Sequence, residues 1–227
     1  GQGALLAAAD GEFYGHHNRH GVRGLAKAMA GAREEGLEFT IPARLLAEEG
    51  CAGEVEIAPR TSWSCPHGIA RWQGLCDCRA GGGGGRRPVW KGQLRKVLEW
   101  LREEAARAWE ERAAEWFADP AAALAEAPAL FPRYPLEERE AFAARHGREG
   151  MKSWELAGAL DLLESQRLSL FALTSCAFFF DDPAGIEPRQ SLRCARRTAE
   201  LLRPFTGRDL LPELERRCRE PSEPSMA

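Results

Sequence analysis

Ala4-Leu-Leu-Ala-Ala-Ala-Asp-Gly-Glu-Phe-Tyr-Gly-His-His17 begins with an apolar run and ends in a group of polar side chains. The run, residues 4–9, predicts a buried strand, although periodicity alone is also compatible with a helical turn. Asp10-Gly11 is a turn signal that ends it. The polar side chains would then follow the carboxyl end of a strand, where α/β folds place their chemistry; they are Asp10, Glu12, His16 and His17. The alternative interpretation is a turn whose carboxylates face water.

The residues that follow continue an α/β pattern. An apolar stripe at helical spacing predicts a helix over 21–35, and a second, short helix is expected over 43–49. Residues 37–41 and 54–57 are β-rich and predict two more strands. The order strand, helix, strand, helix, strand is typical of the end of a parallel α/β unit. One buried strand cannot form a sheet alone, so we expect its partners elsewhere in this chain or in another part of a larger protein.

The chain becomes helical from Trp90 onward. Leucine, alanine and tryptophan recur every three or four residues and predict a long amphipathic helix. The predicted helices are 90–117, 136–146, 153–173, 188–202 and 210–219, with a proline-rich loop or short-helix region before the second and an apolar-then-acidic corner at 174–182. The fold class expected is mainly α with a small α/β part. The expected domains are 1–60, a Cys/His- and Gly-rich loop 61–89, a helical bundle 90–220 and a disordered tail 221–227.

Composition excludes several classes of protein. The 227 residues are 44% hydrophobic and 29% charged, with a net charge of −3, so nothing favours nucleic acid or an anionic membrane. No apolar run approaches the roughly 18 to 20 residues of a membrane helix, and no export leader is visible. The seven cysteines are an odd number and unevenly spaced, which favours reduced thiols and a cytoplasmic location over a disulfide framework.

Cys65-Pro-His67 and Cys76-Asp-Cys78 place three sulfurs and an imidazole within fourteen residues. These are the ligands of a closed tetrahedral zinc site, and four protein ligands would leave no open position, so the ion would be structural. The alternative is a packed loop of unliganded cysteines. The flanking Trp63 and Trp72 could stack on a sugar ring, or could belong to the core.

Two further groups could carry chemistry. His16, His17 and His20 could form a metal site with Asp10, as in a zinc hydrolase, or act as neutral hydrogen-bond donors. Phe178-Phe-Phe-Asp-Asp182 is either an acidic and aromatic corner or an apolar helix end followed by an Asp cap.

Asp10-Gly-Glu-Phe-Tyr-Gly15 resembles the Asp-Gly-Glu-aromatic-aromatic-Gly motif of glycoside hydrolase family 57, α-amylase-type enzymes that act on α-glucans. Three more segments resemble a bacterial subgroup whose barrel is followed by a C-terminal domain of uncharacterised function. They are Thr61-Ser-Trp-Ser-Cys-Pro-His-Gly68, Cys76-Asp-Cys78 and residues 174–187.

The resemblance implies retaining hydrolysis or transglycosylation of an oligo- or polysaccharide, with Asp10 as the general acid. Glu12, His16, His17, Trp63 and Trp72 would contact the substrate, with Asp181 or Asp182 from a helical domain after the barrel. The family's Glu nucleophile lies on an earlier strand, and no Glu of this chain matches it.

We therefore expect this chain to be the C-terminal half of a larger enzyme, the end of a β/α barrel followed by a helical bundle, and to be inactive without the N-terminal barrel half. No cofactor would be needed for catalysis, and the only metal expected is the structural zinc. The competing interpretation is a non-catalytic helical interaction or carbohydrate-binding module with that zinc.

Overall fold

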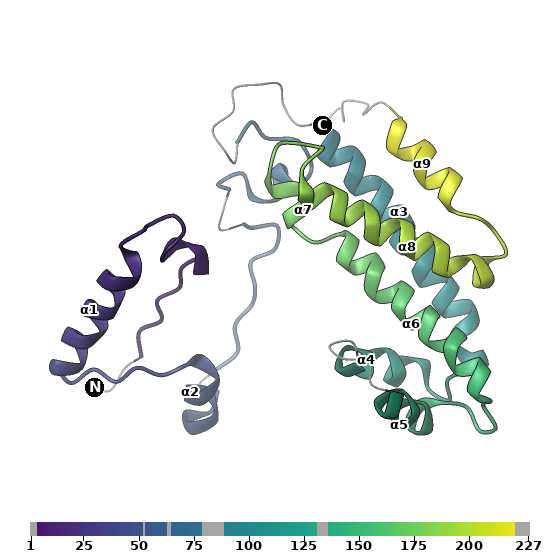
Figure 1. Ribbon diagram of the computed structural model, residues 1–227, viewed down its shortest axis with the longest axis horizontal. Coiled ribbons are helices and arrows are strands. Elements are labelled where there is room, and N and C mark those ends of the chain that lie inside the picture. Colours follow the sequence, from purple (N-terminus) through teal and green to yellow (C-terminus); the bar gives the residue numbers. More distant parts are fainter. Residues whose placement is uncertain (1–3, 52, 63–64, 79–88, 131–135, 221–227) are drawn as a thin grey trace. The chain divides into compact units, whose positions relative to one another are not determined.

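The computed structural model describes residues 4–51, 53–62, 65–78, 89–130 and 136–220 (Figure 1). The predicted disordered tail, 221–227, and the five consecutive glycines at 81–85 lie outside these residues. The chain divides into two compact units, Gly1–Ile57 and Ala58–Ala227. Among the described residues no helix is both long and apolar enough to cross a membrane.

The first unit contains the two predicted helices but not the predicted strands. A 3₁₀ turn, η1 (Gly11–Phe13), is followed by α1 (Gly21–Glu34) and α2 (Pro42–Glu49). The strands expected at 4–9, 37–41 and 54–57 are wrong for this structure, because none of these segments has a neighbouring strand to accept and donate ladder hydrogen bonds. A β/α barrel is therefore not present in the described part of the unit.

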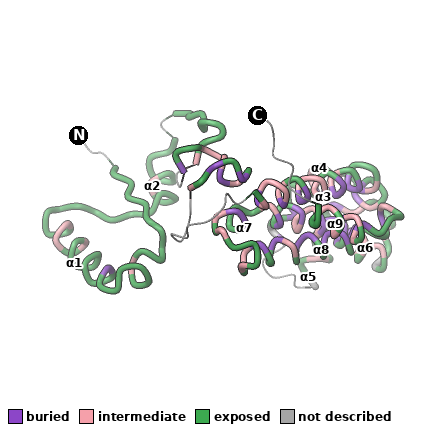
Figure 2. The backbone as a smooth tube through the Cα atoms, turned by 90° about the horizontal axis from the view of Figure 1, so that it is seen from above, coloured by how far each residue is buried: buried purple, intermediate pink, exposed green. Residues whose placement is uncertain are grey.

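The first unit also has almost no core. Gly21 is its only buried residue among those described, and Figure 2 shows the tube of this unit exposed nearly throughout. The apolar side chains of the unpaired segments face solvent, with exposed fractions of 96% for Leu5, 93% for Val55 and 86% for Ile57. These residues carry the hydrophobicity of buried strands without the sheet that would bury them.

The second unit is a helical bundle, as the sequence predicts. Its three long helices, α3 (Trp90–Arg112), α6 (Ser153–Ala172) and α8 (Ile186–Thr206), pack on one another, and α9 (Leu211–Arg219) packs on α3 and α8 (Figure 1). Their apolar stripes meet in one core, whose most deeply buried members include Leu98, Leu101, Leu162, Phe178 and Leu202. Burying one such side chain contributes about 1.5 to 3 kcal/mol.

Shorter elements complete the bundle. The 3₁₀ turn η3 (Ala113–Glu115) extends α3, and α4 (Pro120–Leu130) packs on α5 (Leu136–His146). Asp119 Oδ1 accepts the backbone N–H groups of Ala121 and Ala122, at 3.0 Å each, and so caps the start of α4. The corner expected at 174–182 contains the one-turn helix α7 (Cys176–Phe179), which packs on α8.

Candidate metal centre

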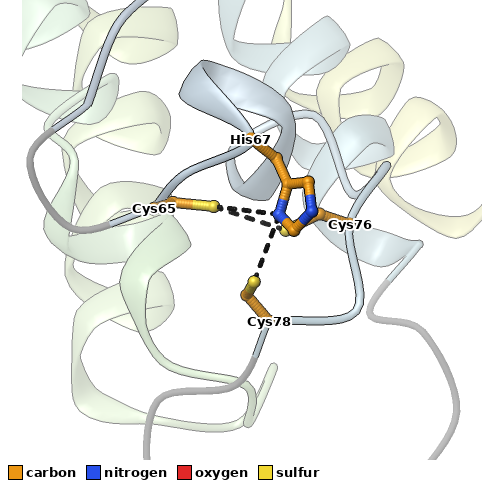
Figure 3. A group of neighbouring side chains, drawn as sticks. All are labelled: Cys65, His67, Cys76 and Cys78. Carbon is orange, nitrogen blue, oxygen red and sulfur yellow. Dashed lines mark hydrogen bonds between the residues drawn. The ribbon is translucent and has the colours of Figure 1, made fainter.

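Four side chains from the loop before α3 point toward one another (Figure 3). Cys65 and His67 precede the 3₁₀ turn η2 (Gly68–Arg71), and Cys76 and Cys78 follow it. The Sγ atoms of Cys65 and Cys76 are 3.8 Å apart. His67 Nδ1 lies 3.7 Å from Cys65 Sγ and 3.3 Å from Cys78 Sγ. All four ligand atoms lie within 4.8 Å of one another, so the group could hold a metal ion.

These separations are close to the edges of a zinc tetrahedron. With Zn–S of about 2.3 Å and Zn–N of about 2.0 to 2.1 Å, tetrahedral angles place two sulfurs about 3.8 Å apart and a sulfur and a nitrogen about 3.6 Å apart. The observed S–S distance of 3.8 Å equals the first value, and the observed N–S distances of 3.3 and 3.7 Å lie on either side of the second. The narrow Cys-x-His and Cys-x-Cys spacings are therefore compatible with tetrahedral ligation.

The loop reaches this geometry through a tight reversal. Gly68 has φ of +61°, and a Cβ atom there would lie 2.3 Å from the carbonyl oxygen of Arg60, so only glycine fits. After η2, the Leu75 N–H donates to the Ala70 carbonyl at 2.9 Å and turns the chain back, which brings Cys76 beside Cys65.

A second close approach fixes the loop to the bundle. A Cβ atom on Gly92, in the first turn of α3, would lie 2.4 Å from the Gln73 carbonyl oxygen. The loop of residues 65–78, called the metal loop below, is therefore in direct backbone contact with the start of α3.

The electrostatics favour a bound cation. Burial alone would raise the pKa of the Cys65 thiol, but hydrogen bonds from the His67 backbone and ring and from the two other thiols lower it to about 7. Burial, together with hydrogen bonding to Cys65 and its charge, raises the pKa of Cys78. Three sulfurs so close cannot all ionise without a positive charge between them, and a divalent ion supplies that charge.

With all four positions filled by protein, such an ion has no open site for water or substrate, which is the arrangement of a structural centre. Among the described residues this is the only group of three or more His, Cys, Asp or Glu side chains that could hold a metal ion. The metal site considered for His16, His17 and His20 with Asp10 is therefore not assembled.

The other N-terminal candidates lie on the surface of the first unit. Asp10 and Glu12 are both exposed. Glu12 Oε2 is 3.6 Å from His17 Nε2, and the rings of His16 and His17 meet edge to face with centroids 4.9 Å apart. These contacts join neighbours along the chain and form no cleft of their own.

The aromatic and acidic candidates of the second unit have structural contacts. Trp72 is partly buried and packs against the helical core, while Trp63 lies outside the described residues. Asp181 accepts a hydrogen bond from Lys91 Nζ at 2.9 Å, and Asp182 Oδ1 accepts the Ala184 N–H at 2.9 Å.

Sequence reasoning missed two buried cations beside this loop. Lys91 is completely buried, and Arg71 is 6% exposed. The only sequence signal for them is their place, one within the Cys/His loop and the other directly after Trp90 in an apolar stripe, where charged side chains are unusual.

Fold and site together define a helical-bundle domain preceded by a Cys₃His cluster that could hold a metal ion. Residues 87–222 match the family described as "Domain of unknown function (DUF3536)", and because the match covers more than half of the chain, the protein belongs to that family. No curated protein and no solved structure matches the chain.

Proposed function

We propose that residues 65–78 bind one structural Zn²⁺ ion, and that the chain acts as the zinc-stabilised C-terminal portion of a saccharide-active protein. The zinc part rests on one observation: the ligand atoms of Cys65, His67, Cys76 and Cys78 all lie within 4.8 Å of one another, and three of their separations, 3.3 to 3.8 Å, are close to the edges of a tetrahedron. The ion would hold the loop against the first turn of α3. The backbones of Gln73 and Gly92 approach closely there, so a small movement of the loop would change this contact.

Metal analysis of the purified chain tests the zinc proposal. We expect one Zn²⁺ per chain, and tetrahedral thiolate absorption in the visible region after replacement by Co²⁺. Cys78→Ser and His67→Ala should each lower zinc affinity by at least about tenfold. Cys176→Ser, which alters an exposed thiol of the same unit outside the cluster, is the matched control and should bind zinc like the unaltered chain. A metal-free chain whose three cluster thiols react freely with thiol reagents would contradict the proposal.

For the larger activity we propose a family 57-like glycoside hydrolase or glucanotransferase acting on α-glucans. The motif that begins at Asp10 supports this proposal, and so does the exposed apolar surface of the first unit. Side chains such as Leu5 and Val55, 96% and 93% exposed, are of the kind that a folded protein usually buries, and exposed apolar surface of this kind would suit a site that another part of the protein covers. The remaining strands of a β/α barrel would supply that cover.

In the assembled barrel Asp10 would protonate the glycosidic oxygen, and a carboxylate from the other half would act as the nucleophile. Glu12, His16 and His17 would bind the saccharide beside it. Trp72 and Asp181 are weaker candidates for sugar contact than the resemblance alone implies, because one packs on the bundle core and the other is paired with Lys91.

Activity on maltooligosaccharides tests this second proposal. We expect none from this chain alone, and turnover when it is produced together with the N-terminal half of a family 57 barrel. Asp10→Asn in the assembled protein should abolish turnover, whereas Glu35→Gln, at an exposed carboxylate of the same unit outside the proposed site, should leave the rate unchanged. Hydrolysis by the isolated chain, or a full rate with Asp10→Asn, would refute the assignment.

The competing proposal is a non-catalytic helical interaction or carbohydrate-binding module with the same zinc. It is favoured by the exposure of Asp10 and Glu12 in a unit with almost no core. Saccharide binding by the isolated chain, with no turnover even beside the barrel half, would establish this alternative.

A further inference from the structure

Arg71, the last residue of η2, is a buried arginine whose Nε–H group has no acceptor among the described residues. Arg71 is only 6% exposed. Among the described residues the guanidinium contacts the Phe179 ring, 5.1 Å from the ring centroid. An aromatic face offsets part of the desolvation of a guanidinium, but it accepts none of the five N–H groups.

Two tryptophans near Arg71 in the sequence or at the adjoining helix also have a buried N–H group without an acceptor. The indole N–H groups of Trp72 and Trp90 are also buried without a partner. Trp72 lies directly after η2 and Trp90 begins α3, and these two elements touch at Gln73 and Gly92. All three unsatisfied atoms, on Arg71, Trp72 and Trp90, are donors, so each of them lacks an acceptor.

The charge balance points the same way. Lys91 Nζ, completely buried, is neutralised by Asp181 at 2.9 Å. Asp181 comes from the same corner as Phe179, which contacts Arg71. Among the described residues no carboxylate forms an ion pair with Arg71, whereas Lys91 is paired, so Arg71 is the buried cation of this junction that remains available to an anion.

We infer that the junction of η2, α3 and the corner at Phe179 binds an oxyanion, the carboxylate or phosphate group of a small molecule, with Arg71 as its principal ligand. A guanidinium presents paired N–H donors that match two oxygens of such a group, and a bidentate contact of this kind supplies both charge and direction. A water molecule would satisfy one or two donors but would leave the charge unmatched. The site is separate from the metal centre, whose four ligands are the Cys and His side chains.

Nitrogen-15 NMR of the arginine side chains in the zinc-loaded full chain tests this inference. Inorganic phosphate and acetate are titrated separately, because a tetrahedral and a planar oxyanion distinguish the two sources. We expect one Nε–H signal to shift saturably and to exchange more slowly with water, and to be the signal that is missing in Arg71→Lys. Arg71→Lys should bind the better oxyanion at least about tenfold more weakly, since an ammonium cannot make the bidentate contact. Arg203→Lys, at an exposed arginine, should bind it unchanged.

Arg71→Met provides a second readout that does not depend on the fold tolerating a new charge. It keeps most of the apolar stem, so in anion-free buffer it should fold at least as stably as the unaltered chain, and its melting temperature should no longer rise with phosphate or acetate. If neither anion shifts the Arg71 signal, or if all variants respond to both anions alike, the site holds only water and the inference is wrong.

Discussion

Replacing Gly92 with alanine tests whether the metal loop rests on α3. Glycine inside a helix costs about 1 kcal/mol relative to alanine, so the exchange would ordinarily stabilise the protein. At this position the new Cβ atom would lie 2.4 Å from the Gln73 carbonyl oxygen. Ordinary carbon–oxygen contacts are about 3.3 to 3.6 Å, so the loop would have to move away by about 1 Å.

A matched control lies in α6. A Cβ atom on Gly158 would have Trp116 Cζ2 as its nearest neighbour, at 3.9 Å, an ordinary contact. Gly158 lies in the interior of α6 and so reports the full gain in helix propensity, while Gly92, in the first turn of α3, gains at most as much and also bears the strain of overpacking, about 1 to 3 kcal/mol. We expect Gly158→Ala to stabilise the bundle by up to about 1 kcal/mol, and Gly92→Ala to be neutral or to destabilise it by up to about 2 kcal/mol.

Urea denaturation of the zinc-loaded chains, followed by far-ultraviolet circular dichroism, measures both values. Zinc affinity by chelator competition gives an independent readout, because a displaced loop alters the spacing of the ligands in Gly92→Ala and not in Gly158→Ala. If Gly92→Ala were as stabilising as its control and bound zinc equally well, the contact between the loop and α3 would not exist.

Three more perturbations have defined outcomes. Zinc binding replaces protons on the thiols, so affinity should fall as the pH drops through the Cys65 pKa of about 7, by about tenfold per pH unit for each proton released; a pH-independent affinity in competition titrations would contradict thiolate ligation. Lys91→Met removes one member of a buried pair and should cost about 2 to 4 kcal/mol in urea, toward the lower end because Asp181 is 19% exposed, whereas Arg95→Met on the same helix breaks an exposed pair and should cost less than about 1 kcal/mol. If the two variants lost the same free energy of unfolding, the Lys91–Asp181 pair would be as exposed to solvent as the Arg95–Glu99 pair. Phe178→Ala empties a fully buried position and should cost about 3 to 5 kcal/mol, while Phe180→Ala, at a side chain 43% exposed, should change thermal stability little; a tolerated Phe178→Ala would remove this corner from the core.

The helical bundle was predictable because its information is local. The spacing of Leu94, Leu98 and Leu101 places one face inward whatever the helix packs against, and α5 begins and ends at the predicted residues, 136 and 146. The strands were not predictable in the same way. A segment such as residues 4–9 has the composition of a buried strand, but a strand exists only when another one pairs with it, and the described residues of this unit offer no partner.

The Cys/His cluster was predictable for a similar reason, since its four side chains lie within fourteen residues and one tight turn brings them together. The roles of Arg71, Lys91 and Asp181 were not, because they depend on how three elements distant in sequence meet. Lys91 and Asp181 are ninety residues apart, and no local pattern indicates that one neutralises the other.

The near-absence of a core in the first unit has a cellular consequence. A segment with leucine and valine side chains bare to water is the kind of surface that chaperones retain and proteases degrade, while a well-packed three-helix assembly resists both. Where that surface is left uncovered, the polypeptide should therefore be trimmed within its first unit, leaving the helical remainder intact.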